Sequence, residues 1–324
     1  MSYTQCEYVW FFAEIELAKS QRYIDSTLNV GVKGNIRFKI LGEFAFITFT
    51  DIEKIASMTP PFDQHGWMQQ TDIIIWLPVA KVENEDISYL YWYPAFICVN
   101  NIYALINGRE TWGYNKYLCD YIMPECVTEL SNFSLSLECF DHFSPESKLQ
   151  MYELFTITIN SQGHENDFFS VLDDFGEQVA NLFSRKHLGI DLSLLKQLLS
   201  GFVNPQMDQI LFKQFSDGSS DSAVYQSVMH SPSMIKKIHR FKFLKPEFTL
   251  HLNKLDSFPL AVMFGLKLGS QALHLPFYVQ MDFDQLAALK FKLLRRIYHG
   301  PRKNCDNWWW CIGYDCCTVF NRAA

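Results

Sequence analysis

A single lysine stands in an aromatic segment that contains two glycines, NGRETWGYNKYLCD, residues 107–120. Lys116 is the one lysine between Lys81 and Lys148. Gly108 and Gly113 indicate tight backbone turns just before it. An uncharged lysine amine can add to a carbonyl carbon and act as a covalent catalyst. The segment is therefore either an ordinary solvated loop or a site of carbonyl chemistry.

A lysine nucleophile must be uncharged at neutral pH, and desolvation or a nearby cation favours that state. Trp112, Tyr114 and Tyr117 supply apolar surface around Lys116. The alternative is a surface lysine whose stem lies on these rings while its ammonium group stays in water.

Arg109 and Glu110, just upstream, also allow two interpretations. The planar guanidinium of Arg109 can bind a substrate carboxylate, with Glu110 orienting it or transferring protons. Alternatively, the two residues form an internal ion pair that holds the loop.

The composition limits the classes of molecule that the protein is expected to bind. The 324 residues carry 28 basic and 35 acidic side chains, a net charge of -7, which argues against a nucleic-acid surface. A small metabolite or another protein is the expected partner. No window approaches the roughly 18 apolar residues of a membrane span, and no basic leader precedes the first residues. We therefore expect a cytoplasmic protein that does not bind membranes.

No cofactor motif or metal motif is present. The nine cysteines include four near the C-terminus, but these form no CxxC pair and do not indicate zinc. The histidines show no HExxH spacing, and there is no glycine-rich phosphate loop. Any chemistry should be independent of cofactor and metal.

Most of the chain has a β pattern. We expect strands at residues 36–50, 71–83, 87–99, 126–140, 149–159, 231–244, 246–255 and 259–283. A short helix is expected at residues 100–107. Another should begin at a capping box of Thr50 and Glu53 and end at Pro60.

Two further helical regions are expected. Residues 166–186 and 191–201 have helical spacing and, with the polar stretch 216–222, predict an insertion that either covers the sheet or moves as a lid. A closing helix is expected at residues 284–300. Together these elements predict one α+β domain on an antiparallel sheet, either a barrel or a sandwich.

The order of elements from residue 36 to 120 resembles the core of the acetoacetate decarboxylase family. The resemblance lies in the strands, the short helix, and Gly-Arg-Glu followed by an aromatic-x-Lys segment. Residues 246–283 resemble the family's last strands more faintly. The implied fold is an antiparallel β-barrel or double-sheet core with peripheral helices. The implied organisation is an N-terminal extension (1–34), this domain (35–300) with a helical insertion near 165–222, and a Cys/Trp-rich tail (301–324).

In that family the lysine forms a Schiff base with a keto acid, and it corresponds to Lys116. Asn115 stands where the family has proline, and Tyr117 where it commonly has a second lysine. Asp72, six residues before Pro78, stands where the family has an active-site glutamate, although it is equally an ordinary residue at the start of a strand.

The resemblance implies a cofactor-independent lyase, most directly a β-keto acid decarboxylase that assembles as a homo-oligomer. Lys116, Glu110 and Asp72 are the expected catalytic residues. The expected substrate-binding residues are Arg109, Trp112, Tyr114 and Tyr117. Two alternatives remain: an aldolase-dehydratase that uses the same iminium, and a non-catalytic binding protein.

Overall fold

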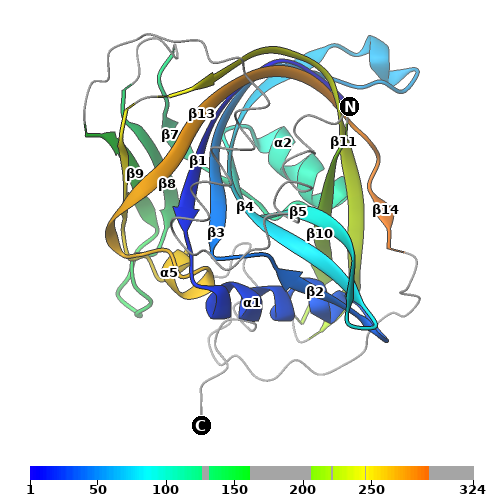
Figure 1. Ribbon diagram of the computed structural model, residues 1–324, viewed down its shortest axis with the longest axis horizontal. Coiled ribbons are helices and arrows are strands. Elements are labelled where there is room, and N and C mark those ends of the chain that lie inside the picture. Colours follow the sequence, from blue (N-terminus) through cyan, green and yellow to red (C-terminus); the bar gives the residue numbers. More distant parts are fainter. Residues whose placement is uncertain (126–130, 161–205, 220–221, 245, 292–324) are drawn as a thin grey trace.

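The computed structural model describes residues 1–125, 131–160, 206–219, 222–244 and 246–291 (Figure 1). The longer strands are β1 (Ser2–Glu14), β3 (Phe44–Ala56), β4 (Trp67–Glu83), β5 (Asp86–Val99), β9 (Gln150–Ile159), β10 (Gln206–Ser216), β11 (Ala223–Phe243) and β13 (Gly269–Gln285). The shorter strands are β2 (Ile36–Ile40), β6 (Lys116–Leu118), β7 (Asp120–Ile122), β8 (Phe133–Cys139), β12 (Phe248–Leu252) and β14 (Leu289–Lys290).

These strands form one continuous, mainly antiparallel hydrogen-bonded system. Its order is β14-β11-β10-β5-β4-β3-β1-β13-β12-β9-β8-β7, with β2 paired to β4 and β6 paired to β5. An additional pairing of β11 with β13 joins two distant positions in this order. The hydrogen bonding therefore returns on itself through β13, β1, β3, β4, β5, β10 and β11, and these strands curve around a shared interior in Figure 1.

The central strands are buried on both faces. In β1, Tyr8 and Trp10 belong to one apolar cluster, while Val9 and Phe11 belong to another. Successive side chains of a strand point to opposite faces, so β1 separates two cores. Residues 8–13 of β1 are consequently a continuous apolar run, with no alternation of polar and apolar residues.

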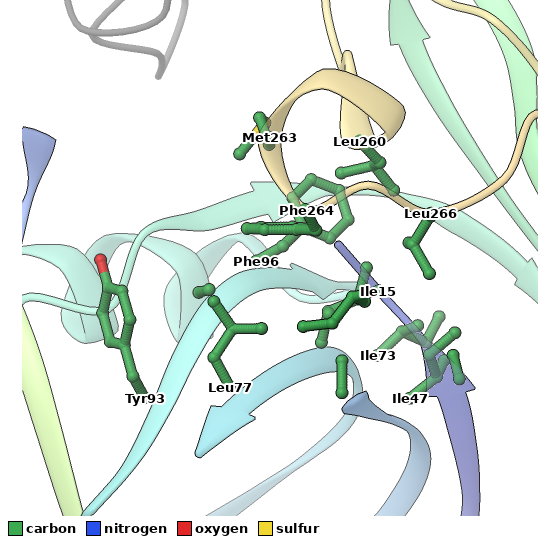
Figure 2. Packing of buried hydrophobic residues seen from close by; sticks show 14 of the residues in the cluster. Ile15, Ile47, Ile73, Leu77, Tyr93, Phe96, Leu260, Met263, Phe264 and Leu266 are labelled. Atoms are coloured by element: carbon green, nitrogen blue, oxygen red, sulfur yellow. The ribbon is translucent and has the colours of Figure 1, made fainter. Parts of the chain in front are cut away.

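Short helices cover one end of the sheet. Helix α1 (Leu17–Ser26) lies beside α5 (Leu260–Met263) at the lower end of the strands in Figure 1. Phe264 follows α5 and packs with Phe96 of β5 in the second core (Figure 2). This packing ties the C-terminal part of the domain to its centre.

The mainly β prediction is confirmed, as are the strands around residues 71–83 and 87–99. Helix α2 (Ile102–Asn107) also forms as predicted. It begins where the Asn101 side chain accepts a hydrogen bond from the backbone N–H of Tyr103 at 2.9 Å, as preferred N-cap residues do.

The helix predicted from Thr50 and Glu53 is wrong, because both residues lie in β3. Thr50 pairs with Tyr8 of β1 on one side and with Asp72 of β4 on the other. A capping pattern is a weak local signal, and pairing with two neighbouring strands overrides it.

Four other expectations need correction. The last part of the predicted insertion, residues 206–216, is strand β10. The first part of the predicted closing helix belongs to β13 and β14, and the predicted strand at 259–283 begins with helix α5. Residues 2–14 form β1, between β3 and β13, so they belong to the sheet and are no extension of it. Each of these segments is held by partners distant in sequence, which local periodicity does not reveal.

The helices expected at residues 166–186 and 191–201, and the tail 301–324, lie outside the described residues. Within the described part of the chain, none of the helices has the length and apolar character needed to cross a membrane.

Candidate active site

Lys116 begins β6, directly after the aromatic segment. Lys116 is 8% exposed, so the alternative interpretation as a surface lysine is wrong. β6 runs parallel to β5, with Lys116 opposite Ile97. The Lys116 side chain enters a pocket that is also lined by Ile97 and Asp72.

Asp72 is the carboxylate that Lys116 meets. Lys116 Nζ lies 3.4 Å from Asp72 Oδ1, and the two side chains are 9% and 13% exposed. The second oxygen, Asp72 Oδ2, accepts a hydrogen bond from Nε2 of the buried Gln70 at 2.8 Å. Gln70 therefore fixes the carboxylate so that one oxygen faces the lysine.

Gly108 makes room for the lysine side chain. A Cβ atom at residue 108 would lie 2.8 Å from Lys116 Cδ and 2.9 Å from Cε. Real Cβ atoms essentially never come this close to another carbon. The first glycine of the segment is therefore explained by the path of the Lys116 stem over its backbone.

Gly113 ends the π-helical turn η3 (Gly108–Trp112) with a positive φ of 94°. A Cβ at this position would also lie 2.5 Å from Cβ of Lys213 on β10. Lys213 Nζ in turn donates hydrogen bonds to the backbone carbonyls of Glu110 and Thr111. The turn before Lys116 is thus anchored to a strand that lies almost a hundred residues away in sequence.

The pocket is small and lined mainly by apolar and aromatic side chains. The volume open to the centre of a water-sized sphere is about 70 Å³. Tyr3, Tyr8 and Trp10 of β1 form one wall, and Trp76 of β4 adds to it. Among the described lining residues, Lys116 is the one cation and Asp72 the one carboxylate.

Another part of the lining is a chain of uncharged hydrogen-bonding groups, which we call the polar wall. Tyr114 Oη donates to Gln209 Oε1 at 2.7 Å, and Gln209 Nε2 donates to Ser233 Oγ at 2.7 Å. Ser233 Oγ donates to Gln285 Oε1 at 2.5 Å. These partners satisfy one another in a buried setting, which gives the wall a defined geometry.

Three phenols in the pocket stay protonated. Burial, with smaller contributions from Tyr3 and Asp72, raises the pKa of Tyr114 well above its ordinary value. Burial also raises the pKa of Tyr3, and Asp72 adds to the effect. The pKa of Tyr8 is raised in the same way, first by burial. At neutral pH these groups are hydrogen-bond donors with no charge.

Four of the predicted site residues lie outside the residues that line the pocket: Arg109, Glu110, Trp112 and Tyr117. Arg109 donates to Asn115 Oδ1 at 3.3 Å and to the Lys116 carbonyl at 3.2 Å, so it holds the turn against β6. The side chain of Glu110 is exposed. Arg109 and Glu110 thus lie away from the pocket lining, and their predicted roles in substrate binding and catalysis stay predictions.

Trp112 and Tyr117 make their contacts outside the pocket lining. Trp112 Nε1 donates to the Leu286 carbonyl at 3.1 Å. Tyr117 follows Lys116 in β6 and therefore points to the other face of the sheet, where its ring packs on Phe96 and Phe258. Of the predicted residues, the structure brings Lys116, Asp72 and Tyr114 together.

The sequence interpretation missed the walls supplied by β1 and β10. Tyr8 and Trp10 come from a segment taken as an extension, and Gln209 from one taken as helical. The signal that was available is the spacing of two between Tyr8, Trp10 and Phe12, which is typical of one face of a strand.

The described residues contain no cluster of three or more metal-ligating side chains. Four of the nine cysteines, Cys6, Cys98, Cys119 and Cys139, are buried free thiols. The others lie outside the described residues.

No protein-family model and no curated protein matches this chain in sequence. Solved structures do match it. An acetoacetate decarboxylase from Legionella pneumophila aligns with 90% of this chain and 86% of its own, at a TM-score of 0.54 and 11% identity. This chain has the fold of acetoacetate decarboxylase. An acetoacetate decarboxylase-like enzyme from Sphingomonas wittichii RW1 aligns with 89% of this chain and 91% of its own, at a TM-score of 0.45 and 9% identity.

The resemblance to acetoacetate decarboxylase is therefore confirmed for the fold. A shared fold at this identity does not establish a shared reaction. The chemistry has to be argued from Lys116, Asp72 and the pocket that contains them.

Proposed function

We propose that this protein is a cofactor-independent carbon–carbon lyase whose Lys116 forms a Schiff base with a small keto acid. Decarboxylation of a β-keto acid is the proposed reaction. The observation that carries the proposal is the buried pair of Lys116 and Asp72, 3.4 Å apart in a pocket lined mainly by apolar side chains.

The first step is imine formation. The uncharged Lys116 amine attacks the ketone carbon, a C–N bond forms, and the carbonyl oxygen leaves as water. The ammonium proton must first be removed, and Asp72 Oδ1 is the base within reach.

The second step is bond cleavage. The carbon–carbon bond to the carboxylate breaks, carbon dioxide departs, and the electron pair moves into the iminium to give an enamine. A proton then adds to carbon, and hydrolysis returns the ketone and the free amine. Asp72, having taken a proton earlier, is positioned to return it.

The pocket also favours loss of the charged carboxylate of the substrate. Among its described lining residues, Lys116 alone could neutralise a substrate carboxylate, and Lys116 is bonded to the substrate at that stage. A substrate carboxylate held in this buried pocket is desolvated, and departure of carbon dioxide relieves that cost.

Reductive trapping tests the proposal. Incubation with acetoacetate and borohydride should add mass at Lys116, located by peptide mapping. Lys116→Met should abolish the adduct, while Lys39→Met, at an exposed lysine of β2, should leave it unchanged. Absence of any adduct across a panel of small keto acids would refute the proposal and favour a non-catalytic binding protein.

Product analysis then identifies the reaction. Carbon dioxide release with formation of a ketone is the expected result. Trapping at Lys116 without carbon dioxide release would refute decarboxylation and favour aldol condensation through the same iminium.

A further inference from the structure

Thr50 presents a buried hydroxyl without a hydrogen-bond partner to the candidate pocket. The residue is 1% exposed, and its Oγ1 has no partner among the described residues. Thr50 also lines the pocket that holds Lys116. A buried unsatisfied hydroxyl costs about 1–3 kcal/mol, and such groups are rare in native proteins.

The position of Thr50 relative to the amine follows from strand pairing. Thr50 on β3 is the direct partner of Asp72 on β4, and Tyr8 on β1 is its partner on the other side. Directly opposed side chains have Cβ atoms roughly 4.5–5.5 Å apart. Asp72 contacts Lys116 Nζ at 3.4 Å. Thr50 lies on the neighbouring strand, so about one strand spacing separates it from the substrate carbon that bonds to the amine.

A short arm of the substrate spans this gap. Neighbouring strands are roughly 4.8 Å apart, and a hydrogen bond between oxygens covers about 2.8 Å of it. The rest of the distance is covered by a substrate carbon that is attached to the ketone carbon and carries an oxygen. The polar wall does not need such a group, because Gln209, Ser233 and Gln285 are already bonded to one another.

The charges around Thr50 favour a substrate oxygen that is uncharged. On one side lies the Asp72 carboxylate, and on the other lies the Tyr8 phenol, which burial keeps neutral. Lys116 is the single cation among the described lining residues, and it is committed to Asp72 and the ketone. A second carboxylate at Thr50 would therefore face an anion with no compensating charge.

We propose that Thr50 is a specificity-determining residue that binds a hydroxyl or carbonyl oxygen carried next to the ketone of the substrate. The proposal rests on the proposed function, since it needs the substrate ketone at Lys116. It narrows the substrate class from small keto acids in general to those with an additional uncharged oxygen.

Two ketones of nearly equal shape provide the test. Hydroxyacetone and butanone differ by a hydroxyl in place of a methyl group, and each can be trapped on the enzyme by borohydride. The concentration giving half-maximal adduct is measured for wild type, Thr50→Val and Thr50→Ser. For each enzyme we take the ratio of these concentrations for the two ketones. Comparing this ratio between enzymes cancels the difference in intrinsic reactivity of the ketones.

Thr50→Val should lower the preference for hydroxyacetone over butanone roughly tenfold, as expected for one lost hydrogen bond. Thr50→Ser should retain the preference because it keeps the hydroxyl. Thr50→Val removes an unsatisfied group at constant shape, so its urea midpoint should not decrease.

An unchanged preference in Thr50→Val, with adducts still forming at Lys116, would overturn the role of Thr50 alone. Failure of wild type to form an adduct with either ketone would overturn the amine chemistry and this inference together. Loss of the preference in Thr50→Ser as well would mean that packing, and not the hydroxyl, selects the substrate.

Discussion

The side chain of Lys116 passes directly over the backbone of Gly108. A Cβ at residue 108 would lie 2.8 Å from Lys116 Cδ, although the two residues are eight positions apart and belong to different elements. The backbone of Gly108 is ordinary for a helix, with φ -61° and ψ -44°. The glycine therefore leaves room for the lysine stem, and its own conformation does not call for glycine.

Gly108→Ala should displace the lysine amine while preserving the fold. A misplacement of about 1 Å can cost roughly 100-fold in rate, so we expect a loss of this order in the rate of borohydride trapping at Lys116. Gly218→Ala is the matched control, because no atom lies within 4 Å of a Cβ at that position. Equal trapping rates in both variants would show that the close approach has no functional consequence.

Asp72→Asn should separate adduct formation from turnover. The amide keeps the shape and the contact with Lys116 but cannot take a proton. Loss of a general acid or base typically costs about 10²–10⁴-fold, so carbon dioxide release should fall by that factor while the adduct still forms slowly. Full turnover in Asp72→Asn would exclude Asp72 from proton transfer.

Gln70→Leu should weaken the same step indirectly. Gln70 donates to Asp72 Oδ2 at 2.8 Å and does not line the pocket, so it positions the carboxylate. We expect a smaller loss of kcat than in Asp72→Asn, with an altered pH profile. Gln70→Glu places a second carboxylate beside Asp72 and should shift the pH profile further. If Gln70 had a purely structural role, the pH profile would not shift.

Tyr114→Phe should destabilise the polar wall. The change leaves Gln209 Oε1 without its donor at 2.7 Å in a buried site. An unsatisfied buried acceptor costs about 1–3 kcal/mol, measurable as a lower free energy of unfolding in urea. Tyr103→Phe is the control, since Tyr103 is 74% exposed. Equal stability of the two variants would contradict the importance of the wall.

Tyr89 should make the protein sensitive to alkali. Burial, followed by the hydrogen bond to Asp208 and its charge, raises the pKa of Tyr89 to about 12. The unfolded value is about 10, so the folded state holds this proton more tightly. The contribution to stability is complete below pH about 10 and is lost as pH rises towards 12.

Unfolding in urea at a series of pH values checks this expectation. The free energy of unfolding of wild type should fall more steeply between pH about 10 and 12 than that of Tyr89→Phe. Parallel pH curves for the two proteins would show that Tyr89 does not link proton binding to folding.

The strands around residues 71–83 and 87–99 were predictable because alternating and continuous apolar patterns are local properties of the chain. Helix α2 was predictable for the same reason, since its N-cap Asn101 precedes it in sequence. Thr50 was not. Its helical cap signal is real, but β3 gains partners on both sides, and sheet pairing decided the conformation.

The sequence alone determined that a lysine lies among aromatic residues after two glycines, because these features are adjacent in the chain. The tertiary structure decided which groups that lysine meets. Asp72 reaches Lys116 across 44 residues, and Tyr8 and Gln209 complete the walls from strands still farther away. Long-range strand pairing brings these residues together, and the free energy that selects it comes from burying both faces of the sheet at once.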